Sequence, residues 1–157
     1  MINRLLMIAL VSSVFYGCSK DDDPNLSLAS ISATYRGEFT IKVPPAVDAD
    51  TISDVDIVIT YDSGKDSAIL RLDLINLNLT PVSYQVSVAC AITSTKDNYS
   101  LSGEKAVSIP DMGNIGVKVE NSSEVDKSGK ATVNITATMP TQAGPMQIPV
   151  KFEGQKR

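Results

Sequence analysis

The sequence predicts an all-β protein, an eight-stranded antiparallel meander β-barrel, with a β-sandwich as the alternative. Apolar and polar residues alternate with a period of two along most of the chain after residue 30, as in strands with one buried face. These alternating segments are short, and turn-forming Pro, Gly, Asp and Asn residues separate them. Nothing after residue 30 has a helical period, so strands joined by short turns are expected throughout.

Each alternating segment is expected to form one strand. The cleanest is 82–93, where Val86, Val88 and Cys90 share one face. Gly37 interrupts the first alternation, which predicts a kink there. At Leu74-Ile75 the apolar positions change face, which indicates either a β-bulge or a strand end followed by a loop. The expected strands are 31–43, 54–61, 68–74, 82–93, 99–109, 115–119, 131–139 and 146–152.

Turn signals lie between these segments. Pro44-Pro45 ends the first strand, and Asp62-Ser63-Gly64-Lys65 predicts a hairpin. The polar stretch 121–130 predicts a loop. One face of each strand is apolar and the other carries Thr, Ser, Lys and Asp. Because Trp is absent and aromatic girdles are missing, we expect a water-soluble barrel rather than a membrane barrel.

The N-terminal segment has the layout of a secretory signal. Arg4 precedes an apolar run from Leu5 to Val14, which is too short to span a bilayer comfortably. Phe15, Tyr16 and Gly17 lead from this run to Cys18, and the segment resembles the lipobox of bacterial lipoproteins. The next residues, 19–23, are Ser-Lys-Asp-Asp-Asp and resemble the export signal of surface lipoproteins of Bacteroidetes. The alternatives are an ordinary signal with a chance cysteine and a solvated charged linker.

The domain boundaries follow from this layout. We expect a lipoprotein signal peptide over 1–17, a lipidated Cys18 with an acidic tether over 18–29, and one β-barrel domain over 30–157. Acyl chains on Cys18 would anchor the protein to the bacterial outer membrane, on the cell surface. The membrane is therefore a predicted partner, reached through the lipid anchor.

Composition excludes several function classes. Without residues 1–17 the chain keeps 13 basic and 18 acidic residues, a net charge of −5, which argues against nucleic acid as a partner. Histidine is absent, so His-dependent nucleophile systems are excluded, and a zinc site is not expected. Cys90 lies at an apolar position, where a buried structural thiol is expected. We therefore expect no enzyme activity and no cofactor.

An acidic cluster is the remaining candidate for metal binding. Asp48, Asp50, Asp54 and Asp56 lie close together in the sequence and supply the oxygen ligands that Ca²⁺ prefers. The spacing lacks the glycine and terminal glutamate of an EF-hand loop, so a solvated acidic edge is the favoured interpretation.

The mature region resembles the calycin-like β-barrel lipoproteins of Bacteroidetes, a lipocalin-like family. The resemblance covers nearly the whole domain, on short motifs: Tyr35-Arg36-Gly37-Glu38-Phe39, Tyr99-Ser100-Leu101-Ser102-Gly103, Val107-Ser108-Ile109-Pro110-Asp111-Met112-Gly113 and the segment from Ile148 to Lys156. It implies an eight-stranded antiparallel barrel, which can be hollow and hold a ligand or be filled by core side chains, and it implies no catalytic residues.

The expected function is therefore that of a non-catalytic binding module for a small apolar or glycan ligand. The alternative is a structural or adhesive surface protein that acts through its outer face or its edge strands. Aromatic residues on the inner face are the candidates to line a ligand site, or else to fill the barrel as core. They are Tyr35, Phe39, Tyr61, Tyr84, Tyr99 and Phe152.

Overall fold

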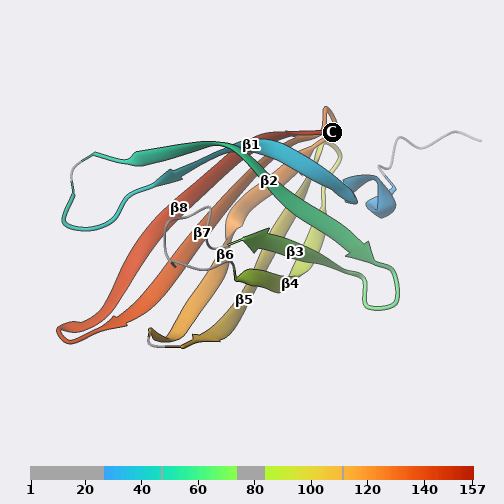
Figure 1. The fold of residues 1–157 in the computed structure, drawn as a ribbon. Coiled ribbons are helices and arrows are strands. Elements are labelled where there is room, and N and C mark those ends of the chain that lie inside the picture. Colours follow the sequence, from blue (N-terminus) through green and yellow to red (C-terminus); the bar gives the residue numbers. More distant parts are fainter. Residues whose placement is uncertain (1–26, 47, 74–83, 111) are drawn as a thin grey trace, which may run out of the picture.

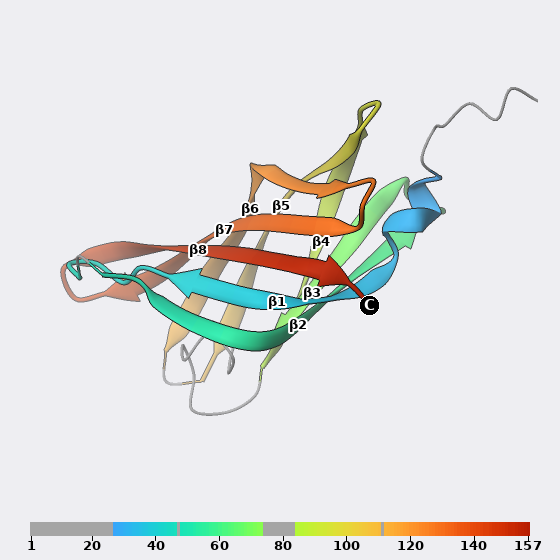
Figure 2. The same ribbon diagram turned by 90° about the horizontal axis from the view of Figure 1, so that it is seen from above.

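The strands follow one another in chain order around a closed barrel, in which β1 pairs with β8 (Figures 1 and 2). The structure is a computed structural model and describes residues 27–46, 48–73, 84–110 and 112–157. The predicted all-β, eight-stranded antiparallel meander barrel is thus confirmed, and the sheet closes instead of forming a sandwich. The strands are β1 (Ala33–Ile41), β2 (Asp50–Asp62), β3 (Ser67–Asp73), β4 (Gln85–Ser94), β5 (Asn98–Ile109), β6 (Gly113–Asp126), β7 (Lys130–Thr141) and β8 (Gly144–Lys156).

Several strand boundaries differ from the sequence prediction; β2 begins at Asp50 and β8 ends at Lys156, for example. Residues 121–126 continue β6, so the predicted loop at 121–130 is wrong over most of its length. Ile31 belongs to a short 3₁₀ helix, η1 (Leu28–Ile31), and not to the first strand. The predicted phase change at Leu74-Ile75 lies outside the described residues. In the part of the chain that the structure describes, no helix is long and apolar enough to cross a membrane.

The inward faces of the strands form one apolar core. Val86, Val88 and Cys90 are buried, as the alternation in 82–93 predicts. The same alternation of buried and exposed positions runs through β7, where Ala131, Val133, Ile135 and Ala137 all face inward. Of the described residues, Ser123 is the single polar one that is buried. The core of the barrel is therefore built from the positions that the two-residue period marks.

Glycines bend the wall where strands approach closely. The kink predicted at Gly37 is confirmed as a register shift between Gly37 and Phe39 in the pairing of β1 with β2. Gly37 also lies opposite Gly154 of β8, and a Cβ on Gly37 would overlap the carbonyl oxygen of Glu153. The absence of a side chain thus lets β1 close against β8.

The two ends of the barrel differ in what they carry. In a meander, the β2–β3, β4–β5 and β6–β7 turns lie at the end where β1 begins and β8 finishes. We call this the tether end, because η1 lies there and is the described element nearest to Cys18 in the sequence (Figures 1 and 2). The β1–β2, β5–β6 and β7–β8 connections lie at the opposite end, which we call the far end.

Candidate functional site

The six aromatic residues predicted to line a ligand site do not gather around one cavity. Phe39 and Phe152 are buried cross-strand partners whose ring centroids lie 5.2 Å apart, and their packing closes the β1–β8 seam. Tyr35 and Tyr99 are also buried in the core. Tyr61 and Tyr84 are half-buried at the edge of the core. Contact of any of these with a ligand stays a prediction.

The protein itself satisfies the hydroxyl groups of three of these tyrosines. The Tyr35 hydroxyl donates to the Ile31 carbonyl at 2.8 Å, and burial raises the Tyr35 pKa to about 12. The Tyr61 hydroxyl donates to Asp66 at 2.8 Å, which raises the pKa of Tyr61. The Tyr99 hydroxyl lies 3.5 Å from Ser30 Oγ. A buried tyrosine needs such a partner, and here η1 and a turn provide it without a ligand.

A small cavity of about 150 Å³ lies at the tether end, beneath η1. Tyr35 and Tyr99 line it together with Ile31, whose side chain is 1% exposed and closes this end of the barrel. Lys156 Nζ donates to the Ser30 carbonyl at 2.7 Å and helps to hold η1 in place. A cavity of this size is well below the 300–1,000 Å³ typical of ligand pockets, so this cavity is too small for an ordinary ligand site.

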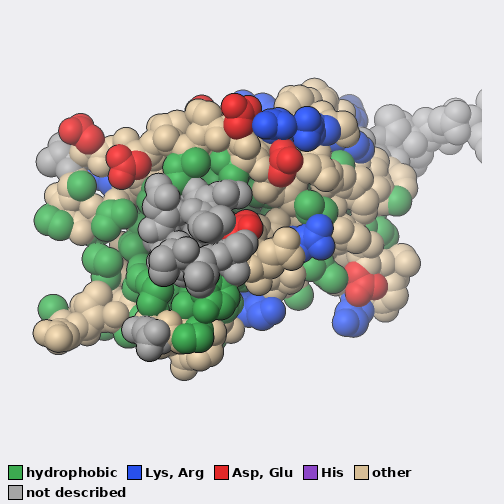
Figure 3. All heavy atoms as spheres, in the orientation of Figure 1, with side chains coloured by type: hydrophobic (Ala, Val, Ile, Leu, Met, Phe, Trp, Pro, Cys, Tyr) green, Lys and Arg blue, Asp and Glu red, His purple; other side chains and the backbone are tan. Residues whose placement is uncertain are grey.

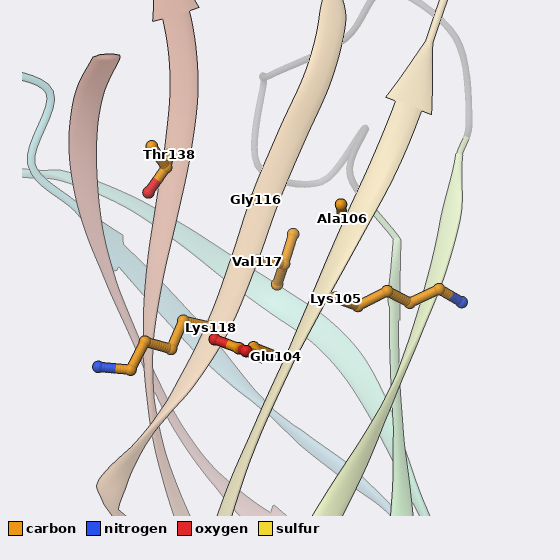
Figure 4. Close-up of a pocket in the computed structure, with 7 residues that line it drawn as sticks. All are labelled: Glu104, Lys105, Ala106, Gly116, Val117, Lys118 and Thr138. Atoms are coloured by element: carbon orange, nitrogen blue, oxygen red, sulfur yellow. The ribbon is translucent and has the colours of Figure 1, made fainter.

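A larger pocket lies on the outer face of β5, β6 and β7 (Figure 4). It has a volume of about 420 Å³ and a floor of small residues, Ala106 and Gly116. The side chains of Lys118 and Lys105 extend to opposite sides of this floor (Figure 4). Glu104 is the cross-strand partner of Lys118, and Thr138 is that of Gly116. Gly116 and its neighbours therefore leave a hollow that charged and hydroxyl groups surround.

A second outer-face pocket, of about 480 Å³, lies beside the first and crosses β6, β7, β8 and β1. Lys118 of the first pocket binds Glu120 of the second, with Nζ 2.8 Å from Oε2. Glu120 Oε1 accepts a hydrogen bond of 2.8 Å from Thr136 Oγ1. We call Lys118, Glu120 and Thr136 the outer-face network, and it joins the two pockets.

Both charged members of the outer-face network stay ionised at neutral pH. The hydrogen bond from Lys118 and then that from Thr136 lower the pKa of Glu120. The same hydrogen bond to Glu120, followed by the negative charges of Glu120 and Glu104, raises the pKa of Lys118. The site thus presents one fixed cation, fixed anions and hydroxyl groups, which can hydrogen-bond a polar ligand.

The acidic cluster is divided between separate ion pairs. Asp54 Oδ1 lies 3.3 Å from Arg36 Nε, and Asp56 Oδ2 lies 3.5 Å from the guanidinium of Arg157. In the described ranges, no three acidic, His or Cys side chains come close enough together to hold a metal ion. Cys90 is buried, and burial raises its pKa to about 11.

The sequence gives only a weak signal for the outer-face site. Thr132, Asn134, Thr136 and Thr138 alternate with the buried residues of β7, which indicates a polar outer face but no pocket. Whether Gly116 leaves a hollow depends on the neighbouring strands, and their register is visible only in the folded sheet. Comparison with protein-family models, with curated proteins and with solved structures gives no match to this chain.

Proposed function

We propose that this protein is a lipoprotein of the bacterial outer membrane, anchored on the cell surface through Cys18, whose barrel is a non-catalytic binding module. Its ligand would be a glycan or another hydroxyl-rich molecule bound at the outer-face pockets. The proposed binding site rests on one observation, the outer-face network of Lys118, Glu120 and Thr136. This network joins two pockets of about 420 and 480 Å³.

The contrast between the two faces of the barrel supports this location. Among the described residues, the inward side chains form one apolar core, and the buried Tyr35 hydroxyl binds the protein itself. The outer face instead offers ionised and hydroxyl groups around a floor of small residues. Polar groups of this kind set the orientation of a hydroxyl-rich ligand, whereas an apolar ligand would need a hollow barrel.

The proposed anchor agrees with the topology. The described chain enters the barrel at the tether end, so an acylated Cys18 would hold that end nearest to the membrane. The far end and the outer face would then point into the surroundings of the cell. The alternative, a structural or adhesive role, would also use the outer face, because β1 and β8 are paired with each other.

Substitution of Cys18 tests the anchor. Cys18→Ala should remove the acyl chains, so the protein should leave the membrane fraction and lose the corresponding lipid mass. The matched control is Ser19→Ala, which leaves the thiol in place. Membrane association and a lipid mass that persist in the Cys18→Ala protein would contradict the proposal.

Filling the first pocket tests the binding site. A Cβ on Gly116 would lie 3.5 Å from the Thr138 Cβ, an ordinary contact, so Gly116→Leu should fold normally while filling the hollow. We expect a soluble polysaccharide to retard the wild-type protein in affinity electrophoresis, and Gly116→Leu to lose at least about tenfold in affinity.

The matched control for Gly116→Leu is Ser87→Leu, on the outer face of β4 and away from both pockets. It should bind as the wild type does. Failure of every polysaccharide in a broad panel to retard the folded wild-type protein would contradict a glycan ligand. Equal losses of affinity in Gly116→Leu and Ser87→Leu would mean that the ligand does not bind in the first pocket.

A further inference from the structure

Two segments of the barrel wall repeat one another in sequence. Residues 115–120 read Ile-Gly-Val-Lys-Val-Glu and lie in β6, and residues 148–153 read Ile-Pro-Val-Lys-Phe-Glu and lie in β8. In both segments the first, third and fifth residues are buried, and the lysine is exposed. The barrel therefore presents the same polar groups, a lysine and a glutamate two residues apart, on the two strands that flank β7 (Figure 1).

The lysine and the glutamate form the same ion pair in each segment. Lys118 Nζ lies 2.8 Å from Glu120 Oε2, and Lys151 Nζ lies 3.0 Å from Glu153 Oε2. The hydrogen bond from Lys151 lowers the pKa of Glu153, as the bond from Lys118 lowers that of Glu120. The ion pair of the outer-face network thus has a counterpart on β8.

Each segment contributes to two successive pockets. The β6 segment lines the first pocket with residues 116–118 and the second pocket with Glu120. The β8 segment lines the second pocket with residues 149–151. Its Glu153 lines a third pocket, of about 390 Å³, which lies over the β1–β8 seam and reaches Ser53 of β2. We call these three pockets the outer-face track, and the repeated segments place equivalent groups along it.

The outer-face track is long, and the two segments follow one another along it at a regular offset. It crosses from β5 through β6, β7, β8 and β1 to β2, which is about 24 Å at a strand spacing of about 4.8 Å. Val117 and Ile148 are both cross-strand partners of Ala137, so the β8 segment is displaced by two residues along the strands. Equivalent groups of the two segments are therefore about 12 Å apart.

Charges of the two signs are balanced along the outer-face track. Arg36 of the third pocket pairs with Asp54 at 3.3 Å, and other ion pairs engage Lys118, Lys151 and Lys130. In the described part of the chain, two basic and two acidic residues of the track make no ion pair, namely Lys42, Lys105, Glu38 and Glu104. The two signs are also interspersed on the face that Figure 3 draws. The track thus has no excess charge that would attract a polyanion or a polycation.

Each pocket of the outer-face track also contains a hydroxyl that makes no hydrogen bond to the described part of the protein. These hydroxyls belong to Thr138 in the first pocket, Thr40 in the second and Ser53 in the third. None of the three residues is buried, so each hydroxyl can donate to and accept from an external molecule. The track therefore offers uncharged hydrogen-bonding groups at intervals along its whole length.

We propose that the outer-face track binds a linear, uncharged polysaccharide as an extended chain that passes through all three pockets. This inference rests on the proposed function, a glycan bound at the outer face. A polymer with a recurring unit would meet equivalent groups at the β6 and β8 segments, whereas a small sugar would meet only one set. Because successive contacts belong to one chain, affinity should rise with chain length until the track is filled.

Affinity electrophoresis of the detergent-solubilised full chain tests this inference. The probes are four neutral polysaccharides, dextran, laminarin, mannan and pullulan, with alginate as the acidic comparison. We expect at least one neutral polysaccharide to retard the protein. Fragments of that polysaccharide with about eight sugar units should compete at least about tenfold more strongly than its disaccharide. Added salt should change this binding by less than about twofold, because no excess charge is involved.

Ser53→Phe tests whether the third pocket belongs to the same site. Ser53 is exposed, so the variant should fold normally while filling this pocket. It should lose at least about fivefold in affinity for the polysaccharide, and its gain with fragment length should stop at shorter fragments than in the wild type. The matched control is Thr60→Phe, also exposed on β2 but outside all three pockets, which should bind as the wild type does.

The outcomes separate the track from the proposed function. A disaccharide that competes as well as longer fragments would refute the track but leave a glycan site at the first pocket. Wild-type affinity of Ser53→Phe for the polysaccharide would do the same. Retardation by alginate alone would overturn the uncharged ligand and leave the glycan function, whereas retardation by none of the five polysaccharides would overturn both proposals.

Discussion

Ser123 stabilises the barrel by replacing part of a backbone ladder. Between the pairs Val119–Ile135 and Glu124–Thr132, β6 has two more residues than β7, so the regular pairing is interrupted. The Ser123 hydroxyl occupies this gap. It donates to the Asn134 carbonyl at 3.1 Å and accepts the Asn134 amide at 3.0 Å.

Ser123→Ala should therefore lower the free energy of unfolding by more than an ordinary serine substitution does. Both backbone groups of Asn134 would lose their partner in a place where Ser123 is fully buried. Each buried group left without a partner costs about 1–3 kcal/mol, which predicts a loss of about 2–6 kcal/mol for the pair. For a domain of this size the melting temperature should fall by roughly 10–20 °C.

Urea unfolding followed by far-UV circular dichroism measures this loss. The matched control is Ser122→Ala, whose exposed hydroxyl only accepts a bond from the Asn134 side chain. That side chain keeps its bond to the Ser122 carbonyl, so the control should lose less than about 1 kcal/mol. Equal unfolding midpoints for the two variants would refute the role given to the Ser123 hydroxyl.

Three further predictions concern the wall and the core. Asp54 has a φ of 60°, so Asp54→Val should be about 1–2 kcal/mol less stable in urea than Asp54→Gly; equal stability would contradict backbone strain at this residue. Val88→Asp should unfold the domain, whereas Ser87→Asp, opposite Arg71, should change stability by less than about 0.5 kcal/mol; similar melting temperatures would contradict the face assignment. Because burial raises its pKa to about 11, Cys90 should resist iodoacetamide at about pH 8 until urea unfolds the protein; rapid labelling of the native state would contradict its burial.

The two-residue period was sufficient to predict the strands and the all-β class, although it left a barrel and a sandwich both open. It marks the buried face of each strand, and Val86, Val88 and Cys90 are buried as it requires. It failed in β6, where a serine stands at a buried position and the polar residues around it resemble a loop. Ser123 is compatible with the core only because Asn134 of the next strand binds its hydroxyl. A partner in another strand is not visible in a local pattern.

The candidate site could be predicted less well for the same reason. Of the aromatic residues that suggested a lumen ligand, Phe39 and Phe152 pack against each other across the seam, and the Tyr35 hydroxyl binds η1. The outer-face network depends on which residues of β6 and β7 are neighbours. Neither Lys118 nor Thr136 indicates a binding site when it is considered alone in the sequence. Sequence reasoning found the faces of the strands, but cross-strand register decides which polar groups meet.

The pairing of β1 with β8 constrains the order in which the barrel can form. Every other ladder joins strands that are consecutive in the chain, whereas this one joins the first strand to the last. Synthesis produces β1 first and its partner last, so one edge of β1 has no partner until nearly the whole chain exists. A truncation that removes β8 would leave open edges on both β1 and β7, and exposed edges of this kind recruit strands from other molecules.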